Sequence, residues 1–222
     1  MIEDDPDLQA ELDEALLALE ELIAESPEEA LSMVDSLPEA VRNRVEFRLT
    51  TARALQAVDE LEKARQMCEV IAAETTDLGL RADVHHLLGD LLEDLEQPDL
   101  ANSHFEKALQ LDQELFQTRG HLTEQELEQR LQALLPQALD LLPAAQRSKI
   151  TSFTVQLFPT PADIQAGLDP RAFSAYEKSG TAGTLRIFSA NLDAEYGDLD
   201  ELGEFEQHVL VELREQLNEH TS

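Results

Sequence analysis

The chain has 222 residues, enough for one large or two small domains with hydrophobic cores of their own. Its 16 Lys and Arg residues stand against 47 Asp and Glu residues, which gives a formal net charge of −31. Such a field repels nucleic acids and anionic membranes, so we expect neither as a partner, whereas it attracts proteins with a basic surface.

The acidic residues are concentrated at the start of the chain, since residues 1–40 contain 14 of them and no Lys or Arg. This start is the opposite of the basic segment that opens a secretory signal peptide, and no apolar stretch approaches the roughly 18 residues of a membrane span. The single cysteine, Cys68, cannot form an intramolecular disulfide. We therefore expect a cytoplasmic protein in which Cys68 is a buried structural thiol. Solubility alone, or adaptation of the source to salt, would also explain the acidity.

The first half of the chain has the pattern of amphipathic helices. From Leu8 to Leu115, apolar residues recur at three- and four-residue spacing and glycine is nearly absent. Short breaks predict helices of about 10–18 residues joined by turns. These breaks fall at residues 26–27, 37–38, 75–79 and 97–98. The sequence therefore predicts an all-helical domain over residues 1–118.

Small and apolar residues also repeat within this half. The best-defined copy spans residues 85–112 and has Leu88, Gly89 and Leu92 in one helix and Ala101, Phe105 and Ala108 in the next. Fainter copies of the second-helix spacing precede it at Ala64, Cys68 and Ile71, and at Ala30, Val34 and Leu37. This pattern resembles the tetratricopeptide repeat. The resemblance implies a solenoid of three helical hairpins with a groove for a peptide or partner helix. A plain helical bundle that only supports the second half is the alternative.

The second half mixes helix and strand. A capping box at Thr123 and Glu126 predicts a helix to about Leu135, with a kink or a break at Pro136. Residues 153–158 and 184–188 have the composition and alternation of strands. An apolar stripe predicts a last helix over about 200–219. We expect an α+β domain whose small sheet is covered by helices.

The order of these elements over residues 122–222 resembles the minimal matrix-metalloprotease-like family, which has a zincin-like fold. In that family the last helix carries H-E-x-x-H, whose two histidines bind Zn²⁺ while the glutamate serves as general base. Here Glu212 matches the glutamate, but Val211 and Glu215 occupy the two ligand positions. Because valine cannot bind a metal, the resemblance implies the fold without the activity and without a cofactor.

Other candidate sites are few. His208, Glu212 and Glu215 lie on the last predicted helix and are candidates for a displaced metal site, although charge patterning on an exposed face produces the same residues. His85 and His86 are adjacent on a helix, so their side chains point about 100° apart and cannot bind one ion together. We expect His85 to pack within the repeat. No nucleophilic triad or phosphate-binding loop is visible.

We therefore favour a non-catalytic protein-interaction protein, in which an acidic repeat domain is joined to a pseudo-metalloprotease domain. Four glutamates near the N-terminus are its candidate partner-binding residues, and they are Glu20, Glu21, Glu28 and Glu29. The expected partner has a basic surface and could be an enzyme that the protein inhibits or sequesters. Two alternatives remain open, an active zinc metallopeptidase with rearranged ligands and a structural or assembly protein that acts by self-association.

Overall fold

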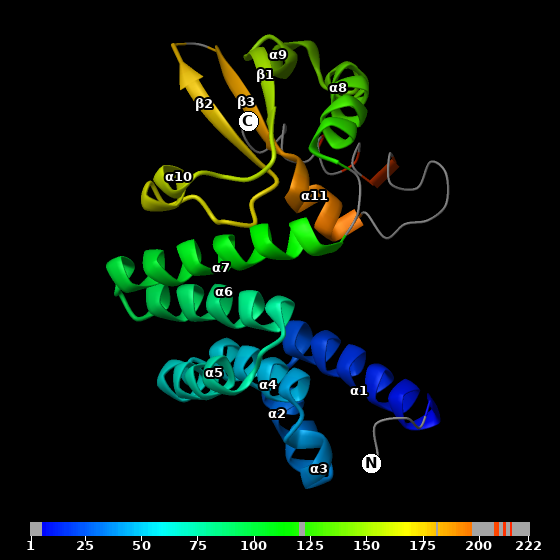
Figure 1. Cartoon of the computed structure of the whole chain (residues 1–222), viewed down its shortest axis with the longest axis vertical. Coiled ribbons are helices and arrows are strands. Elements are labelled where there is room, and N and C mark those ends of the chain that lie inside the picture. Colours follow the sequence, from blue (N-terminus) through cyan, green and yellow to red (C-terminus); the bar gives the residue numbers. More distant parts are fainter. Residues whose placement is uncertain are drawn as a thin grey trace. The chain divides into compact units, whose positions relative to one another are not determined.

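The computed structural model describes residues 6–119, 123–180 and 182–196 and the positions 207, 208, 211 and 214 (Figure 1). The chain divides into two compact units, Met1–Asp112 and Gln113–Ser222. The division falls inside the long helix α7 (Pro98–Arg119), just before the expected boundary at residues 118–122. Separate folding of the two parts stays a prediction. None of the described helices is long and apolar enough to cross a membrane.

The described part of the first unit is helical, as the apolar spacing predicts. Its helices before α7 are α1 (Pro6–Glu25), α2 (Pro27–Ser36), α3 (Glu39–Arg42), α4 (Val45–Ala57), α5 (Leu61–Glu74) and α6 (Leu78–Asp94). Consecutive long helices pack on each other as α1 with α2, α4 with α5, and α5 with α6, and α4 also contacts α1 and α2. Figure 1 shows α6 and α7 side by side. The resemblance to tetratricopeptide repeats stays a prediction.

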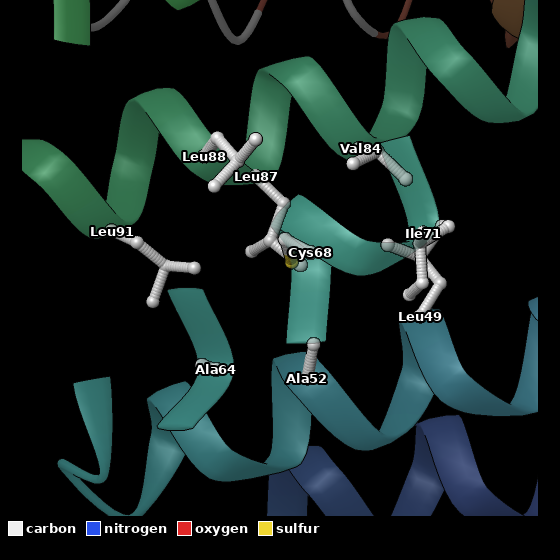
Figure 2. Close-up of a cluster of buried hydrophobic side chains, with 9 residues drawn as sticks. All are labelled: Leu49, Ala52, Ala64, Cys68, Ile71, Val84, Leu87, Leu88 and Leu91. Atoms are coloured by element: carbon white, nitrogen blue, oxygen red, sulfur yellow. The ribbon is translucent and has the colours of Figure 1, made fainter. Parts of the chain in front are cut away.

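Two apolar clusters hold these helices together. One joins α1, α2 and α4 through Leu12, Leu19, Ala30, Val34, Phe47 and Ala54. The other joins α4, α5 and α6, and Figure 2 shows its nine buried side chains. Cys68 lies inside this second cluster and is fully buried, which confirms the structural thiol. Burial raises the pKa of the Cys68 thiol to about 12, so it carries no thiolate at neutral pH.

The residues of the repeat pattern lie where two helices must approach closely. Leu88, Gly89 and Leu92 are buried in α6, and Ala101, Phe105 and Ala108 are buried in α7. A Cβ atom added at Gly89 would lie 2.3 Å from Cε1 of Phe105, well inside van der Waals contact. Glycine is therefore required here by packing, because the Phe105 ring occupies the space that any other side chain would need.

The turns between α4 and α5 and between α6 and α7 have the same geometry. Asp59 (φ 63°) and Glu96 (φ 58°) both adopt the left-handed conformation, 37 residues apart. After Asp59, the Glu60 N–H donates to the Leu55 carbonyl at 2.8 Å, and the Gln97 N–H donates to the Leu92 carbonyl at 2.8 Å in the second turn. Both turns are Schellman motifs. The Schellman turn thus recurs after 37 residues, the same separation as that between Ala64 and Ala101 in the sequence.

These turns predict a stabilising substitution. Left-handed backbone is strained for residues with a Cβ atom, so Asp59→Gly and Glu96→Gly should each raise the free energy of unfolding by about 0.5–1 kcal/mol. Urea unfolding of the full chain measures the change. The control is Glu93→Gly, because Glu93 lies inside helix α6 and glycine there should lower stability by about 1 kcal/mol. Equal effects at Glu93 and Glu96 would contradict the prediction.

The second unit combines a small mixed sheet with helices. After the end of α7, its described elements are α8 (Glu124–Asp140), α9 (Ala144–Arg147), β1 (Ile150–Gln156), α10 (Pro161–Gln165), β2 (Ser174–Ser179), β3 (Ala182–Phe188) and α11 (Ser189–Tyr196). The strand order is β1-β3-β2, with β1 parallel and β2 antiparallel to the central strand β3. The described part of the chain is thus mostly helical with a small three-stranded sheet, which is compatible with the predicted α+β class.

The two faces of this sheet differ in chemistry. Leu185 and Ile187 of β3 point into an apolar core that contains residues of α8 and α11, among them Leu131, Leu135 and Leu192. Alternation along a strand places Thr184 and Arg186 on the opposite face. The neighbouring strands add Ser152 and Glu177 beside Thr184 on that face. The apolar face holds the unit together, and the polar face carries its charged groups.

Two details differ from the sequence predictions. Helix α8 does not break at Pro136 but continues to Asp140, because Leu134, Leu135 and Ala138 on both sides of the proline are buried in the core. This packing outweighs the roughly 3 kcal/mol that an interior proline costs. The sheet also has a third strand, the edge strand β2, which is not among the two strands predicted from the sequence.

Candidate functional site

The four candidate partner-binding glutamates point away from the core of the first unit. Glu20 and Glu21 lie in the last turns of α1, Glu28 and Glu29 lie in the first turn of α2, and all four are exposed. Oε1 of Glu20 lies 3.8 Å from Nη1 of Arg53 on α4, a long and exposed ion pair. Such a pair neutralises little charge in water. The four carboxylates therefore give an acidic surface that faces solvent.

The sequence explains this arrangement through amphipathic helices. Leu19 of α1 and Ala30 of α2 are fully buried next to the exposed glutamates, so one face of each helix packs and the other is acidic. Pro27 sits at the first position of α2, where its missing N–H is harmless, and the two acids that follow interact favourably with the helix dipole. The acidic residues are thus compatible with the fold and leave the negative charge at the surface.

The predicted metal candidates lie mainly outside the described residues. His208 and Val211 are helical with exposed side chains, whereas Glu212 and Glu215 are not among the described residues. Within the part of the chain that the structure describes, no three His, Cys, Asp or Glu side chains are grouped as a metal site requires. The vestigial general base and the displaced zinc site therefore stay predictions.

We expect the purified full chain to contain no stoichiometric zinc and to cleave no peptide. The physical reason is that Val211 supplies no ligand atom, so Glu212 has no metal-bound water to activate. Elemental analysis and a peptide-library digest measure the two outcomes. Stoichiometric zinc that is lost in His208→Ala or Glu212→Ala would contradict the prediction and support the metallopeptidase alternative.

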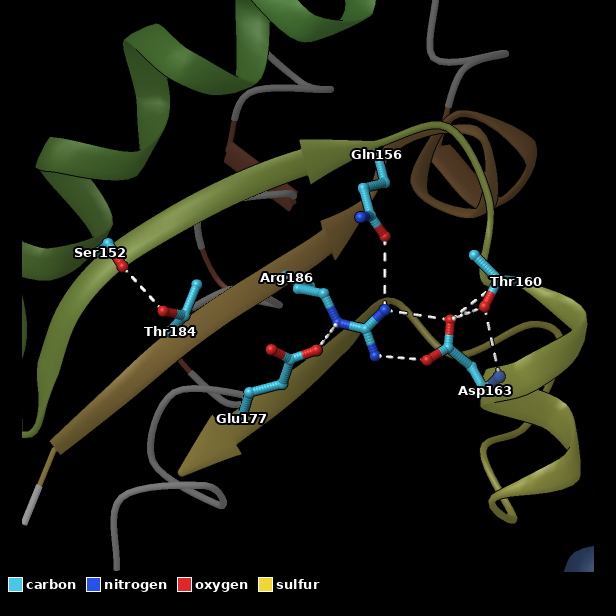
Figure 3. A network of polar contacts seen from close by, with 7 residues as sticks. All are labelled: Ser152, Gln156, Thr160, Asp163, Glu177, Thr184 and Arg186. Carbon is cyan, nitrogen blue, oxygen red and sulfur yellow. Dashed lines mark hydrogen bonds and ion pairs between the residues drawn. The ribbon is translucent and has the colours of Figure 1, made fainter. Parts of the chain in front are cut away.

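A polar network on the sheet of the second unit was not predicted from the sequence (Figure 3). Arg186 of β3 donates from Nη2 to Oδ1 of Asp163 at 2.6 Å and from Nη1 to Oδ2 at 3.0 Å. Its Nε atom lies 2.8 Å from Oε1 of Glu177, but the N–H does not point at that oxygen, so this contact is an ion pair without a hydrogen bond. Arg186 and Asp163 are both largely buried, at 14% and 16% side-chain exposure.

Asp163 also stabilises the start of α10. Its carboxylate accepts hydrogen bonds from the Thr160 backbone N–H at 2.8 Å and from the Thr160 hydroxyl at 2.7 Å. The Asp163 backbone N–H donates in return to the Thr160 hydroxyl oxygen at 3.3 Å, which completes a capping box. The hydrogen bonds from Arg186, followed by those from Thr160, hold the pKa of Asp163 well below its usual value. The arginine has two carboxylate partners, and this network joins α10 to the sheet.

The first unit also brings together two histidines that sequence reasoning did not pair. His85 of α6 and His104 of α7 lie 2.9 Å apart between their Nδ1 atoms. His85 is partly buried and packs against the neighbouring helix, while the repeat itself stays a prediction. The sequence carries no direct signal for this contact, because the two histidines lie 19 residues apart on separate helices.

No protein-family model, curated protein or solved structure matches this chain.

Proposed function

We propose that the chain is a non-catalytic protein-interaction protein that uses the acidic surface of α1 and α2 to bind a partner with a basic surface. The observation that carries the proposal is the exposure of Glu20, Glu21, Glu28 and Glu29 on two helices that pack on one core. Because the two helices are packed on a core, the four carboxylates keep a fixed arrangement. The basic groups of a partner can be complementary to such an arrangement.

The charge balance around this surface supports the same conclusion. Residues 1–40 contain no Lys or Arg, and Arg53 is the basic side chain that lies near Glu20 among the described residues. Long-range attraction of this kind acts mainly on the rate of encounter, while apolar contacts set how long the complex lasts. Leu17, which is 63% exposed on α1 between acidic residues, is suited to supply such an apolar contact.

In this proposal the second unit supplies a further binding surface rather than a reaction. This unit resembles a metalloprotease but lacks the two zinc-binding histidines. Its largely buried Arg186 is paired with two carboxylates. A fold of this kind can hold a protein substrate or an enzyme without cleaving it. Inhibition or sequestration of a basic enzyme is therefore the use that we propose.

The test begins with a partner captured from an extract of the source organism, identified and then purified. We expect its association rate with the full chain to fall as salt rises, because the Debye length shortens to about 8 Å at physiological ionic strength. Changing Glu20, Glu21, Glu28 and Glu29 together to glutamine should slow association roughly tenfold and alter dissociation much less. Surface plasmon resonance measures both rates.

The control removes the same number of charges elsewhere on the first unit. Its four substitutions are Glu93→Gln, Asp94→Asn, Glu96→Gln and Asp99→Asn, all of exposed residues at the α6–α7 turn. This variant should associate nearly as fast as the parent chain. If both variants slow association equally, the four glutamates act only through the overall negative charge of the chain. Association rates that change neither with salt nor in either variant would overturn the proposal. Binding only between copies of the chain would support the self-association alternative.

A further inference from the structure

The contact between α6 and α7 contains two imidazole rings that face each other. Nδ1 of His85 lies 2.9 Å from Nδ1 of His104, and the ring centroids are 5.1 Å apart with the planes tilted by 35°. At this distance one nitrogen must donate a proton and the other must accept it. The pair can be neutral, with one Nδ1–H between the rings, or it can hold one extra proton in the same hydrogen bond. Two imidazolium rings would place two N–H groups against each other.

The charged groups around the pair come from three helices. Arg81 of α6 and Lys107 of α7 act on His85 and disfavour its protonation, while Glu69 of α5 favours protonation of His104. Burial is the largest effect on both rings, and it lowers the pKa of His85 to about 4 and lowers the pKa of His104. The charge of His104 is the second largest effect on His85. The two sites are thus coupled, so a proton on one ring disfavours a proton on the other.

The rings lie near the close contact between Gly89 and Phe105. His86, next to His85, contacts the ring of Phe105 edge-on, with centroids 5.6 Å apart. Phe105 in turn fills the space above Gly89. A shift that separates the two imidazoles therefore also disturbs the contact of Phe105 with α6.

We propose that the His85–His104 pair is an acid-sensitive contact that keeps α7 packed on α6 with no more than one extra proton, and that a second proton loosens this helix pair. The inference is independent of the proposed partner. It gives the first unit a response to mild acid, because the ordinary pKa of histidine lies in that range.

The direction of the pH dependence follows from the number of protons bound. In the unfolded chain both histidines titrate near the ordinary pKa of 6.5, whereas in the folded chain the pKa of His85 is about 4. The unfolded state therefore binds more protons between these values. The stabilisation is fully present above pH 6.5 and is lost progressively as pH falls toward 4.

Hydrogen exchange of the full chain tests the proposal. After correction for the intrinsic exchange rate, protection of the α6 and α7 amides should fall roughly tenfold between pH 7.5 and pH 5.0, a value reduced for the partial exposure of the pair. The variant His85→Gln/His104→Gln keeps polar side chains that do not titrate, so its protection should change much less. The control His86→Gln leaves the pair intact and should respond to pH like the parent chain.

A second measurement does not depend on how well the variant folds. Side-chain ¹⁵N NMR of the parent chain should show one ring of the pair still neutral at pH 5.0, with a hydrogen bond between the two Nδ1 atoms at pH 7.5. Protonation of both rings above pH 6 with unchanged protection of α6 and α7 would overturn the proposal. An equal loss of protection in the parent chain and in His85→Gln/His104→Gln would overturn it as well.

Discussion

Gly89→Ala should lower the free energy of unfolding of the chain by about 1–3 kcal/mol, the usual cost of overpacking a core. The added Cβ would lie 2.3–2.7 Å from three atoms of the Phe105 ring. Alanine normally stabilises a helix interior by up to about 1 kcal/mol relative to glycine, so the expected sign is the reverse of helix propensity. The ring has little room to move, because Phe105 is only 5% exposed. Urea unfolding followed by circular dichroism measures the change.

The repeat itself provides the control for this prediction. Ala52 and Cys68 lie 37 residues before Gly89 and Phe105, so the earlier copy combines a larger residue on the first helix with a smaller one on the second. The double variant Gly89→Ala/Phe105→Cys reproduces that combination. It should be no less stable than Phe105→Cys alone, since the clashing ring is gone. If alanine at position 89 destabilises the chain equally with and without the ring, the overlap is not the cause.

Arg186→Met should lower the free energy of unfolding of the second unit by about 1–3 kcal/mol at pH 7. The substitution leaves Asp163 charged and largely buried without its bidentate partner. Tyrosine fluorescence during urea unfolding reports this unit selectively, because the chain has no tryptophan and its two tyrosines, Tyr176 and Tyr196, both belong to the second unit.

The matched control is Arg147→Met, which removes an exposed ion pair with Asp140 at 46% and 76% side-chain exposure. Its effect should stay below about 1 kcal/mol. Arg186 lowers the pKa of Asp163, so its stabilisation is present above the ordinary pKa of 3.8 and is lost as pH falls below that value. The difference between Arg186→Met and the parent chain should therefore shrink at pH 3. Equal effects of the two substitutions would show that Arg186 acts as a surface charge.

The helices of the first unit could be predicted because the signals are local. Apolar spacing and the prolines at positions 27 and 98 define where helices run and begin. The small residues Gly89 and Ala101 indicated close approach, and the structure places both in buried positions between α6 and α7. What the sequence did not show was the backbone repeat, since neither Asp59 nor Glu96 is glycine, the residue that most often adopts the left-handed conformation.

Elements that depend on distant contacts were harder to predict. The edge strand β2 has the mixed sequence Ser-Ala-Tyr-Glu-Lys-Ser, which becomes a strand only through pairing with β3. Arg186 meets Asp163 over 23 residues and His85 meets His104 over 19, distances at which spacing carries no direct signal. One clue was available, because an arginine between Leu185 and Ile187 in a strand requires a partner.

Because Cys68 is buried, its reactivity is a built-in probe of local opening of the chain. A thiol reagent can react with this protein at one atom, the Sγ of the single cysteine, and only while α4, α5 and α6 are parted. The alkylation rate of Cys68 therefore reports how often the first unit opens, and tyrosine fluorescence reports unfolding of the second unit. If the alkylation rate and the tyrosine fluorescence change at the same urea concentration, the two units unfold together in one cooperative transition. If they change at different urea concentrations, the two units fold independently.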